Sequence, residues 1–257
     1  MQLITDIFHE NNGWYGFRRV TLELRERGLR VNKKKVRRLM DKLGLKGKRP
    51  KVKYRSYQGD MNGTVKNLLL DEVVDDDHHK TYYKRNFSTT HCNEIWTTDV
   101  SMFSIPAGKL YLSPIMDIHN REIIAYSISK SPNYAQIQDM LDKAFQQYEH
   151  LEGVIMHSDQ GWQYQMKAYH QALGERGIVQ SMSRKGNCLD NAPMENFFGI
   201  MKNEMFYGHE AEFETLDELR EAMEEYITYY NAKRITEKLK GLTPVAYRRQ
   251  SLKKQAI

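Results

Sequence analysis

The chain has 257 residues, of which 40% are hydrophobic and 28% charged, an ordinary composition for a globular protein with one large domain and a small one. Its two cysteines exclude a disulfide scaffold, and no second cysteine pair stands at zinc-finger spacing, so we expect no structural zinc. Without a signal peptide or an apolar run of roughly 18 residues, we expect a cytoplasmic protein with no membrane segment.

The net charge of +6 is unevenly distributed along the chain. Residues 1–60 contain 17 Lys and Arg against 6 Asp and Glu, a net of +11, whereas the remainder carries −5. A positive charge confined to one segment favours a polyanionic partner for that segment.

The N-terminal segment predicts two helices within residues 13–45. Val20 and Leu24 form an apolar stripe in the first helix, and Asn32 is a good N-cap for the second. We predict a helix–turn–helix-like DNA-binding segment over residues 1–50, with a solvated basic helix as the alternative. The cations expected to neutralise phosphates lie on the second helix: Lys33, Lys34, Lys35, Arg37 and Arg38.

Residues 51–93 show no sustained apolar period, and we expect an extended or partly disordered linker there. From residue 94 the chain alternates between patterns typical of strands and of helices, beginning with a meander of three strands, the first of them over 94–105. This order predicts a mixed α/β sheet. We assign 94–210 to a catalytic core and 211–257 to a C-terminal helical extension.

Two acidic residues come where predicted strands end. Asp99 lies in "WTTDVS" on the first strand of the meander, and Asp159 ends "GVIMHSD". If these strands are neighbours, both carboxylates emerge at one end of the sheet, where sites on open α/β sheets usually lie. Adjacent carboxylates repel each other unless a cation lies between them, and Mg²⁺ prefers such oxygen ligands.

A third acid follows in "SRKGNCLDNAPMENFFGIMKNEM", residues 183–205, where a helix begins. Asp190 or Asn191 can cap that helix. Glu195 and Lys202 are seven residues apart and therefore share a face, which we expect to point toward the end of the sheet. We expect Glu204 to face solvent.

Phe197, Ile200 and Met201 suit a different, core-directed face of this helix. Three carboxylates around two magnesium ions are suited to phosphodiester chemistry, because one ion activates a water or a 3′-hydroxyl while the other stabilises the leaving oxygen. Spacing alone does not single out these three among 33 acids.

The local context of these acids is more specific. "WTTDVS", "HSDQGWQY" and "SRKGNCLDNAPMENFFGIMKNE" resemble, in order, the signature blocks of bacterial insertion-sequence transposases with a retroviral-integrase-like catalytic core. The 35 residues between Asp159 and Glu195 match the spacing of that Asp-Asp-Glu superfamily. The resemblance continues into "YYNAKRITEKLKGLTPVAYR" and "YGFRRVTLELRERG", so it covers most of the chain.

The resemblance implies an RNase H-like core with a five-stranded sheet, in which the third strand of the meander is an edge. It maps the catalytic, metal-binding acids onto Asp99, Asp159 and Glu195, and a contact with the element's DNA end onto Lys202. It also implies hydrolysis at the 3′ ends followed by strand transfer through direct transesterification, with Mg²⁺ or Mn²⁺, expected as two ions.

The family also implies partners. Its members act as multimers on paired DNA ends, with terminal inverted repeats and target DNA as substrates. The chain is similar to the second-frame product of a two-frame element, so we expect it to be fused to, or to act with, the first-frame product. One departure is that Arg234 is followed by Ile235 and Thr236, where many relatives have a histidine two residues after the arginine.

Several other residues near these blocks are expected to be structural. We expect a surface or loop-positioning role for Asp117, a hydrogen-bonded core position for His157, and packing positions for Trp96 and Trp162, with base stacking as the minority alternative for the tryptophans. Two alternative functions remain: a non-catalytic DNA-binding regulator, and an RNase H-like nuclease that cuts without joining.

Overall fold

The computed structural model describes residues 1–47, 65–75 and 80–255. The N-terminal segment forms three helices, α1 (Gln2–Glu10), α2 (Phe17–Glu26) and α3 (Lys33–Lys42). Two of them were predicted, and the Asn32 side chain caps α3 by accepting a 2.8 Å hydrogen bond from the Lys34 amide. The unpredicted α1 completes a small apolar core with the other two helices, to which it contributes Ile4 and Ile7.

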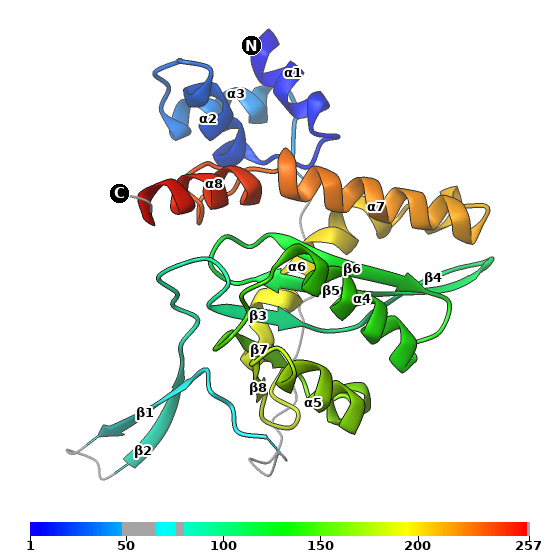
Figure 1. Ribbon diagram of the computed structural model, residues 1–257. Coiled ribbons are helices and arrows are strands. Elements are labelled where there is room, and N and C mark those ends of the chain that lie inside the picture. The colour runs from blue at the N-terminus through cyan, green and yellow to red at the C-terminus, as the bar shows by residue number, and fades with distance from the viewer. Residues whose placement is uncertain (48–64, 76–79, 256–257) are drawn as a thin grey trace.

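Part of the predicted linker is regular structure, contrary to our expectation. Strands β1 (Leu70–Asp75) and β2 (Lys80–Arg85) pair antiparallel and form a two-stranded sheet separate from the main one (Figure 1). Their β-branched and aromatic residues suit strands, and the register places Asp71 opposite Lys84 and Val73 opposite Tyr82, pairs that stabilise a hairpin. The prediction of a linker failed because the sequence of these two short strands shows no long apolar period.

The main sheet consists of six strands, two of which lie end to end along the same neighbour, so the sheet is five strands wide. Strands β3 (Ile95–Thr98) and β4 (Ser101–Ile105) both pair with β5 (Gly108–Asp117), so the strand predicted over 94–105 is interrupted at Asp99 and Val100. The third strand of the meander, β6 (Ile123–Ser129), pairs with β5 and is an edge, as expected. On the other side of β3, β7 (Ile155–Ser158) and β8 (Val179–Met182) are parallel to it.

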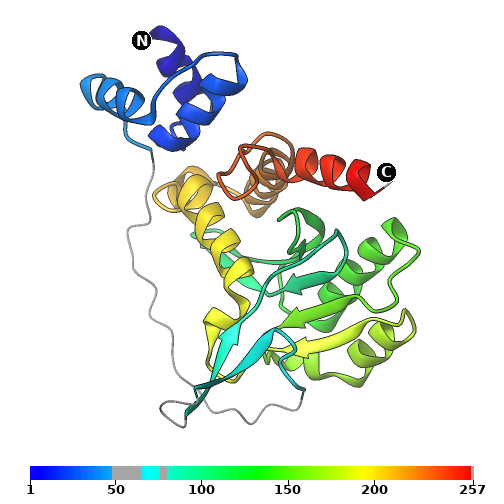
Figure 2. The ribbon, with the colours of Figure 1, turned by 90° about the vertical axis from the view of Figure 1, so that its left-hand side faces the viewer.

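Helices cover both faces of this sheet (Figures 1 and 2). One core lies beneath α4 (Tyr134–Gln147) and α5 (Lys167–Gly174). The other is formed by the sheet with α6 (Ala192–Met201) and α7 (Leu216–Ala232), so α7 shares the core of the sheet although we had placed it in a separate extension. The fold is thus the expected α/β, RNase H-like mixed sheet flanked by helices, with a small all-α segment before it.

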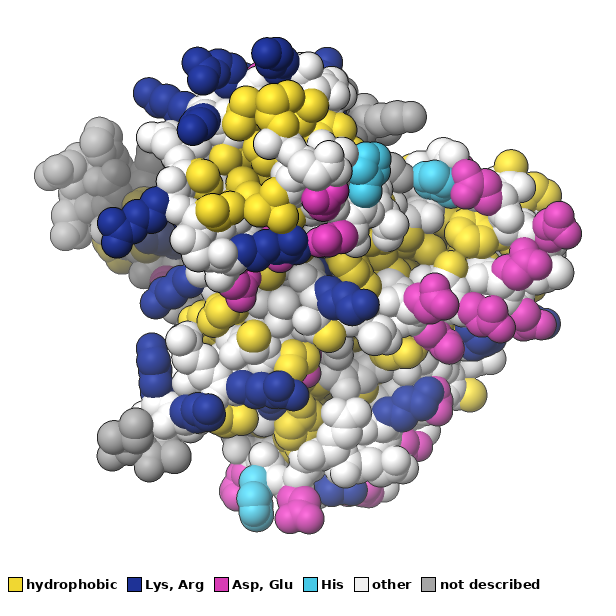
Figure 3. Space-filling model, turned by 90° about the horizontal axis from the view of Figure 1, so that it is seen from above, with side chains coloured by type: hydrophobic (Ala, Val, Ile, Leu, Met, Phe, Trp, Pro, Cys, Tyr) yellow, Lys and Arg dark blue, Asp and Glu magenta, His cyan; other side chains and the backbone are white. Residues whose placement is uncertain are grey.

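The C-terminal residues form α8 (Pro244–Gln255), and the N-terminal helices lie above α7 and α8 (Figure 1). Seen from above, Lys and Arg side chains gather over the N-terminal helices, whereas Asp and Glu gather at the end of the molecule where α7 begins (Figure 3). No helix in the described ranges is both long and apolar enough to span a bilayer.

Candidate active site

Parallel pairing of β3 with β7 brings Asp99 and Asp159 together. The register pairs Thr97 with His157, so each aspartate lies two residues beyond a paired position, at the carboxyl end of its strand. Both carboxylates accept backbone hydrogen bonds: Asp99 Oδ1 from the Val100 amide at 2.7 Å, and Asp159 Oδ1 from the Gly161 amide at 2.9 Å. The strands are therefore neighbours, which is the condition under which we expected the two carboxylates to meet.

Glu195 comes to this end of the sheet from the first turn of α6. Burial, followed by the charge of Asp159 and then by that of Glu195, raises the pKa of Asp99 to about 7, while the Val100 amide and Lys202 oppose the shift. Glu195 of α6 and Lys202, which directly follows that helix, thus both influence the Asp99 carboxyl. The charges of Asp159, Glu195 and Lys202 therefore all act on the Asp99 carboxyl.

The pKa values of Asp159 and Lys202 are shifted as well. Asp159 is open to solvent as a residue, yet burial of its carboxyl among neighbouring groups raises its pKa. Burial lowers the pKa of Lys202, and Asp99 opposes that shift. The Lys202 ammonium also lies 4.9 Å from the centre of the Phe103 ring, so the lysine is held beside the acids by a cation–π contact.

The donor set is suited to a hard divalent cation, because it consists of carboxylates whose mutual repulsion a cation would relieve. Within the described residues, no three His, Cys, Asp or Glu side chains are close enough together to form a complete metal site as they stand. Asp99 and Asp159 follow the ends of paired strands, and the charge of Glu195 on α6 also acts on Asp99. The residues present therefore fit such an ion, with the helix-borne acid closing the site.

Asp190 is not a helix cap, contrary to one of the alternatives we predicted. Its side chain is fully buried and accepts hydrogen bonds from Arg184 Nε at 2.8 Å, Arg85 Nε at 2.6 Å and Asn67 Nδ2 at 3.1 Å. Burial opposes ionisation, but the bonds from Arg184 and then from Arg85 lower the pKa of Asp190. The aspartate thus anchors the base of the β1–β2 hairpin to the loop before α6.

The other predicted cap, Asn191, makes no capping bond either. Its side-chain oxygen instead accepts a hydrogen bond from the Thr97 hydroxyl, and its Nδ2 donates to the Thr98 carbonyl oxygen at 3.0 Å. Sequence reasoning missed this role, because the partners precede Asn191 by more than ninety residues.

Glu204 is buried, so its predicted solvent-facing position was wrong. It lies in a π-helical turn, Lys202–Phe206, that continues α6, and is only 5% exposed. It accepts bonds from Arg234 at 2.8 and 2.9 Å, from Arg19 at 3.2 Å and from the Tyr226 hydroxyl at 2.7 Å. Despite its burial, these partners, Arg234 foremost, lower the pKa of Glu204.

A signal for this position was present in the sequence. Glu204 stands seven residues after Phe197 and three after Met201, both of which belong to the core-directed face of α6. Helical periodicity therefore directed Glu204 inward. The same cluster gives Arg234, in the C-terminal block that departs from many relatives, a structural role as the partner of a buried acid.

The residues expected to be structural are mostly placed as predicted. His157 is fully buried between the Ser181 and Ser183 hydroxyls, at 2.9 and 3.1 Å, and burial lowers the pKa of His157 to about 4. Trp96 is buried in the core. Trp162 is 56% exposed in the turn that follows Asp159, so its predicted packing position was wrong.

Asp117 has a loop-positioning role, as one of the predicted alternatives had it, although it is fully buried. It accepts hydrogen bonds from the backbone amides of Asn93 and His119 at 2.8 and 2.9 Å, and from Arg248 of α8 at 3.1 Å. It pairs with Trp96, three residues before Asp99, and so lies about 10 Å along the strand from the acids.

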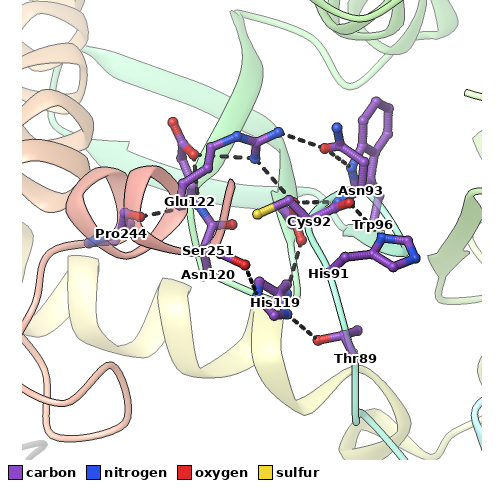
Figure 4. A network of polar contacts seen from close by, with 12 residues as sticks. Thr89, His91, Cys92, Asn93, Trp96, His119, Asn120, Glu122, Pro244 and Ser251 are labelled. Atoms are coloured by element: carbon purple, nitrogen blue, oxygen red, sulfur yellow. Dashed lines mark hydrogen bonds and ion pairs between the residues drawn. The ribbon is translucent and has the colours of Figure 1, made fainter. Parts of the chain in front are cut away.

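A polar network around His119 and Asn120 fastens α8 to the sheet (Figure 4). His119 lies between the Thr89 hydroxyl at 3.1 Å and the Ser251 hydroxyl at 2.9 Å, and Asn120 donates to the Pro244 carbonyl at 3.2 Å. Through these contacts the network joins three segments that are far apart in the sequence.

The basic helix α3 presents all five predicted cations to solvent, while its Val36 and Met40 are buried. Lys33, Lys34, Lys35, Arg37 and Arg38 are exposed. The position of these charges leaves both the DNA-contact and the solvated-surface interpretations available.

The fold and this cluster of acids define the class of an integrase-type catalytic core. Models of the integrase core domain match residues 89–188 and 195–252, and a model of an HTH-like domain matches residues 1–53. A chain of the simian T-cell lymphotropic virus intasome, solved with the PP2A regulatory subunit B56 gamma, shares the fold with a TM-score of 0.51 and 15% identity, over 63% of this chain and 57% of that one.

Close relatives identify the family. The chain is 48% identical over 248 residues to the transposase InsK for insertion sequence element IS150 of Escherichia coli, covering 96% of this chain and 82% of that protein. It is 34% identical over 233 residues to the transposase for insertion sequence element IS904 of Lactococcus lactis, covering 90% and 86%. The chain belongs to the family of insertion-sequence transposases with an integrase core domain, and is therefore a polynucleotidyl transferase of the Asp-Asp-Glu superfamily.

Proposed function

We propose that this transposase cleaves the 3′ ends of its insertion sequence and joins them to target DNA by direct transesterification, with Asp99, Asp159 and Glu195 as the catalytic, metal-binding residues. The observation that supports the proposal is that parallel pairing of β3 with β7 puts Asp99 and Asp159 at one end of the sheet, where burial of the Asp99 carboxyl, the charge of Asp159 and that of Glu195 raise the pKa of Asp99. Elsewhere around α6, the buried acids Asp190 and Glu204 are ion-paired to arginines.

The three carboxylates would hold divalent cations, Mg²⁺ or Mn²⁺ and two in number. Bound there, such ions supply activation of a water or 3′-hydroxyl and stabilisation of the leaving oxygen. The remaining tasks belong to the chain. β3 and β7 fix the two aspartates, α6 brings Glu195 opposite them, and the half-buried Lys202 offers its ammonium to a phosphate of the element's end.

DNA is the proposed partner, in the form of terminal inverted repeats and target. The exposed cations of α3, on a segment that matches an HTH-like domain, would neutralise its phosphates. Assembly as a multimer on paired ends, and cooperation with a first-frame product, complete the proposal. A frame-fused chain assayed beside the chain alone tests the last point.

The test is a strand-transfer assay. A labelled duplex that carries the element's terminal repeat is incubated with the protein, Mg²⁺ or Mn²⁺, and supercoiled target DNA. We expect joined product from the wild type and from Glu221→Gln, a matched change at an exposed glutamate on α7, and none from Glu195→Gln. Cut but unjoined product from the wild type would indicate a nuclease. Equal joining by Glu195→Gln would remove that residue from the proposal.

A further inference from the structure

The amide of Asn191 lies between the two backbone segments that carry Asp99 and Glu195. Its oxygen accepts the hydrogen bond of the Thr97 hydroxyl, and its nitrogen donates to the Thr98 carbonyl at 3.0 Å. Asp99 directly follows the last residue of β3, and Glu195 follows Asn191 by four residues, in the first turn of α6. One side chain thus connects the end of β3 to the start of the helix.

Both hydrogen bonds of this connection are buried, so their loss would be costly. Asn191 is 3% exposed, and Thr97 and Thr98 are fully buried, so water has little access to replace a lost bond. Among small side chains, an amide supplies both a donor and an acceptor in a fixed geometry, which a carboxylate or an alkyl group does not. Removing it would leave a buried hydroxyl and a buried carbonyl without these partners.

We propose that Asn191 is a positioning residue that sets the distance between Glu195 and the Asp99–Asp159 pair, and thereby the affinity of the site for divalent cations. This inference rests on the proposed function. Asn191 itself reaches β3 and not the reacting groups, so its effect passes through the two acids on either side of it. The connection matters because Glu195 comes from a helix, whereas the aspartates belong to adjacent, directly paired strands.

The chain contains a matched control for the purely structural contribution of such an amide. Asn231 of α7 fastens its helix to a strand in the same way: its oxygen accepts from the Ile123 amide at 3.0 Å, and its nitrogen donates to the Ile123 carbonyl at 2.9 Å. Ile123 begins β6, an edge of the sheet separated from β3 by β5. Both asparagines join a helix to the sheet, but only Asn191 adjoins the catalytic acids.

The experiment measures Mn²⁺ binding to the DNA-free protein, by the electron paramagnetic resonance signal of unbound Mn²⁺, together with thermal unfolding. The variants are Asn191→Ala, Asn231→Ala, and Thr97→Val, which removes one hydroxyl and keeps the shape of the side chain. We expect Asn191→Ala to weaken Mn²⁺ binding by about 10-fold or more, as loss of a group that orients a metal ligand does. Thr97→Val should weaken it by roughly 3-fold, because only one of the two bonds is lost.

Asn231→Ala, at a half-buried position, should lower the melting temperature no more than Asn191→Ala does and leave Mn²⁺ affinity within about 2-fold of the wild type. Wild-type affinity in both Asn191→Ala and Thr97→Val would overturn the inference, as would an equal loss in Asn231→Ala. If Asn191→Ala does not fold, the decision passes to Thr97→Val. Asp99→Asn and Glu195→Gln are run in parallel: unchanged Mn²⁺ binding in both overturns the proposed function itself, whereas a loss in these two alone overturns only the role of Asn191.

Discussion

Two sets of acids lie around α6, and they differ in their partners. The strand-end set, Asp99 and Asp159, for which we propose a catalytic role, has raised pKa values, because burial of the carboxyls and, for Asp99, the neighbouring carboxylates disfavour the charge. The anchor set, Asp190 and Glu204, has lowered pKa values despite burial, because each carboxylate is held by two arginines. The carboxylate group therefore has two different roles in the segments around α6.

The difference shows which acids are already neutralised within the fold. An ion pair with two arginines fully offsets the charge of an anchor carboxylate, and breaking such a buried pair is costly. Two neighbouring carboxylates with no such arginine repel each other, and a bound cation can relieve this repulsion. Among these four acids the pKa is lowered where two arginines hold the carboxylate and raised at the two strand ends. The buried Asp117, which has one arginine partner, Arg248, also has a raised pKa, so the direction of the shift reflects the partners and does not by itself mark a site.

The largest effect expected is on catalysis. Asp99→Asn removes one metal-binding charge, and strand transfer should fall by about 10³-fold, which corresponds to several kcal/mol of lost transition-state stabilisation. The same change should stabilise the metal-free protein at pH 8, because it removes the repulsion with Asp159. Joined product and melting temperature are measured on one preparation; a lower melting temperature would show that Asp99 is an anchor rather than part of a site.

In the anchor set, Glu204→Gln should destabilise the protein by about 3–5 kcal/mol, since it leaves two arginines partly or fully buried without their carboxylate. Urea unfolding at pH 7 measures the loss. Glu221→Gln, at an exposed position of α7, controls for the substitution itself and should cost less than about 0.5 kcal/mol. A loss below about 1 kcal/mol in Glu204→Gln would contradict the anchoring role.

Asp190→Asn should cost less, about 2–3 kcal/mol. Its arginines reach solvent more readily: the side chains of Arg85 and Arg184 are 31% and 17% exposed, whereas that of Arg234, the closest partner of Glu204, is 5% exposed. The same urea unfolding measures both variants. A cost equal to or above that of Glu204→Gln would mean that the exposure of the arginines does not set the strength of these anchors.

The pH dependence of stability should have opposite signs in the two sets. The folded pKa of Asp99 is above its ordinary value, so its contribution is present below about pH 4 and lost as the pH rises through about 7. The folded pKa of Glu204 is below its ordinary value, so its contribution is present above about pH 4 and lost as the pH falls.

Over the window from pH 4 to 7, the loss attributable to Asp99 should be on the order of 1–3 kcal/mol in metal-free protein. Unfolding profiles of the wild type, Asp99→Asn and Glu204→Gln measure these contributions as differences, because other carboxylates titrate in the same range. The free energy of unfolding of Asp99→Asn should rise relative to that of the wild type as the pH increases, and added Mn²⁺ should cancel this difference. If the free energies of unfolding of all three proteins changed in parallel with pH, the two sets would not differ in protonation.

Much of the core was predictable because it depends on local pattern. The order of strands and helices follows from hydrophobic period, and the edge position of β6 follows from the resemblance. Asp99 and Asp159 lie at strand ends that the sequence marks directly. The hairpin β1–β2 was missed because short, half-exposed strands carry a weak periodic signal.

By itself, the sequence determined the α/β class and the basic N-terminal helices, because these depend on the type and spacing of residues along one segment. The choice of the three proposed catalytic acids depended in addition on the resemblance of their sequence blocks to those of a known family. Only the tertiary structure decided that Asp190 and Glu204 are anchors and that Asn191 joins α6 to β3. Their partners are distant in the chain: Arg85 is 105 residues from Asp190, and Arg19 is 185 residues from Glu204. The state of a buried charge is set by what packs against it, and that is established only when the chain has folded.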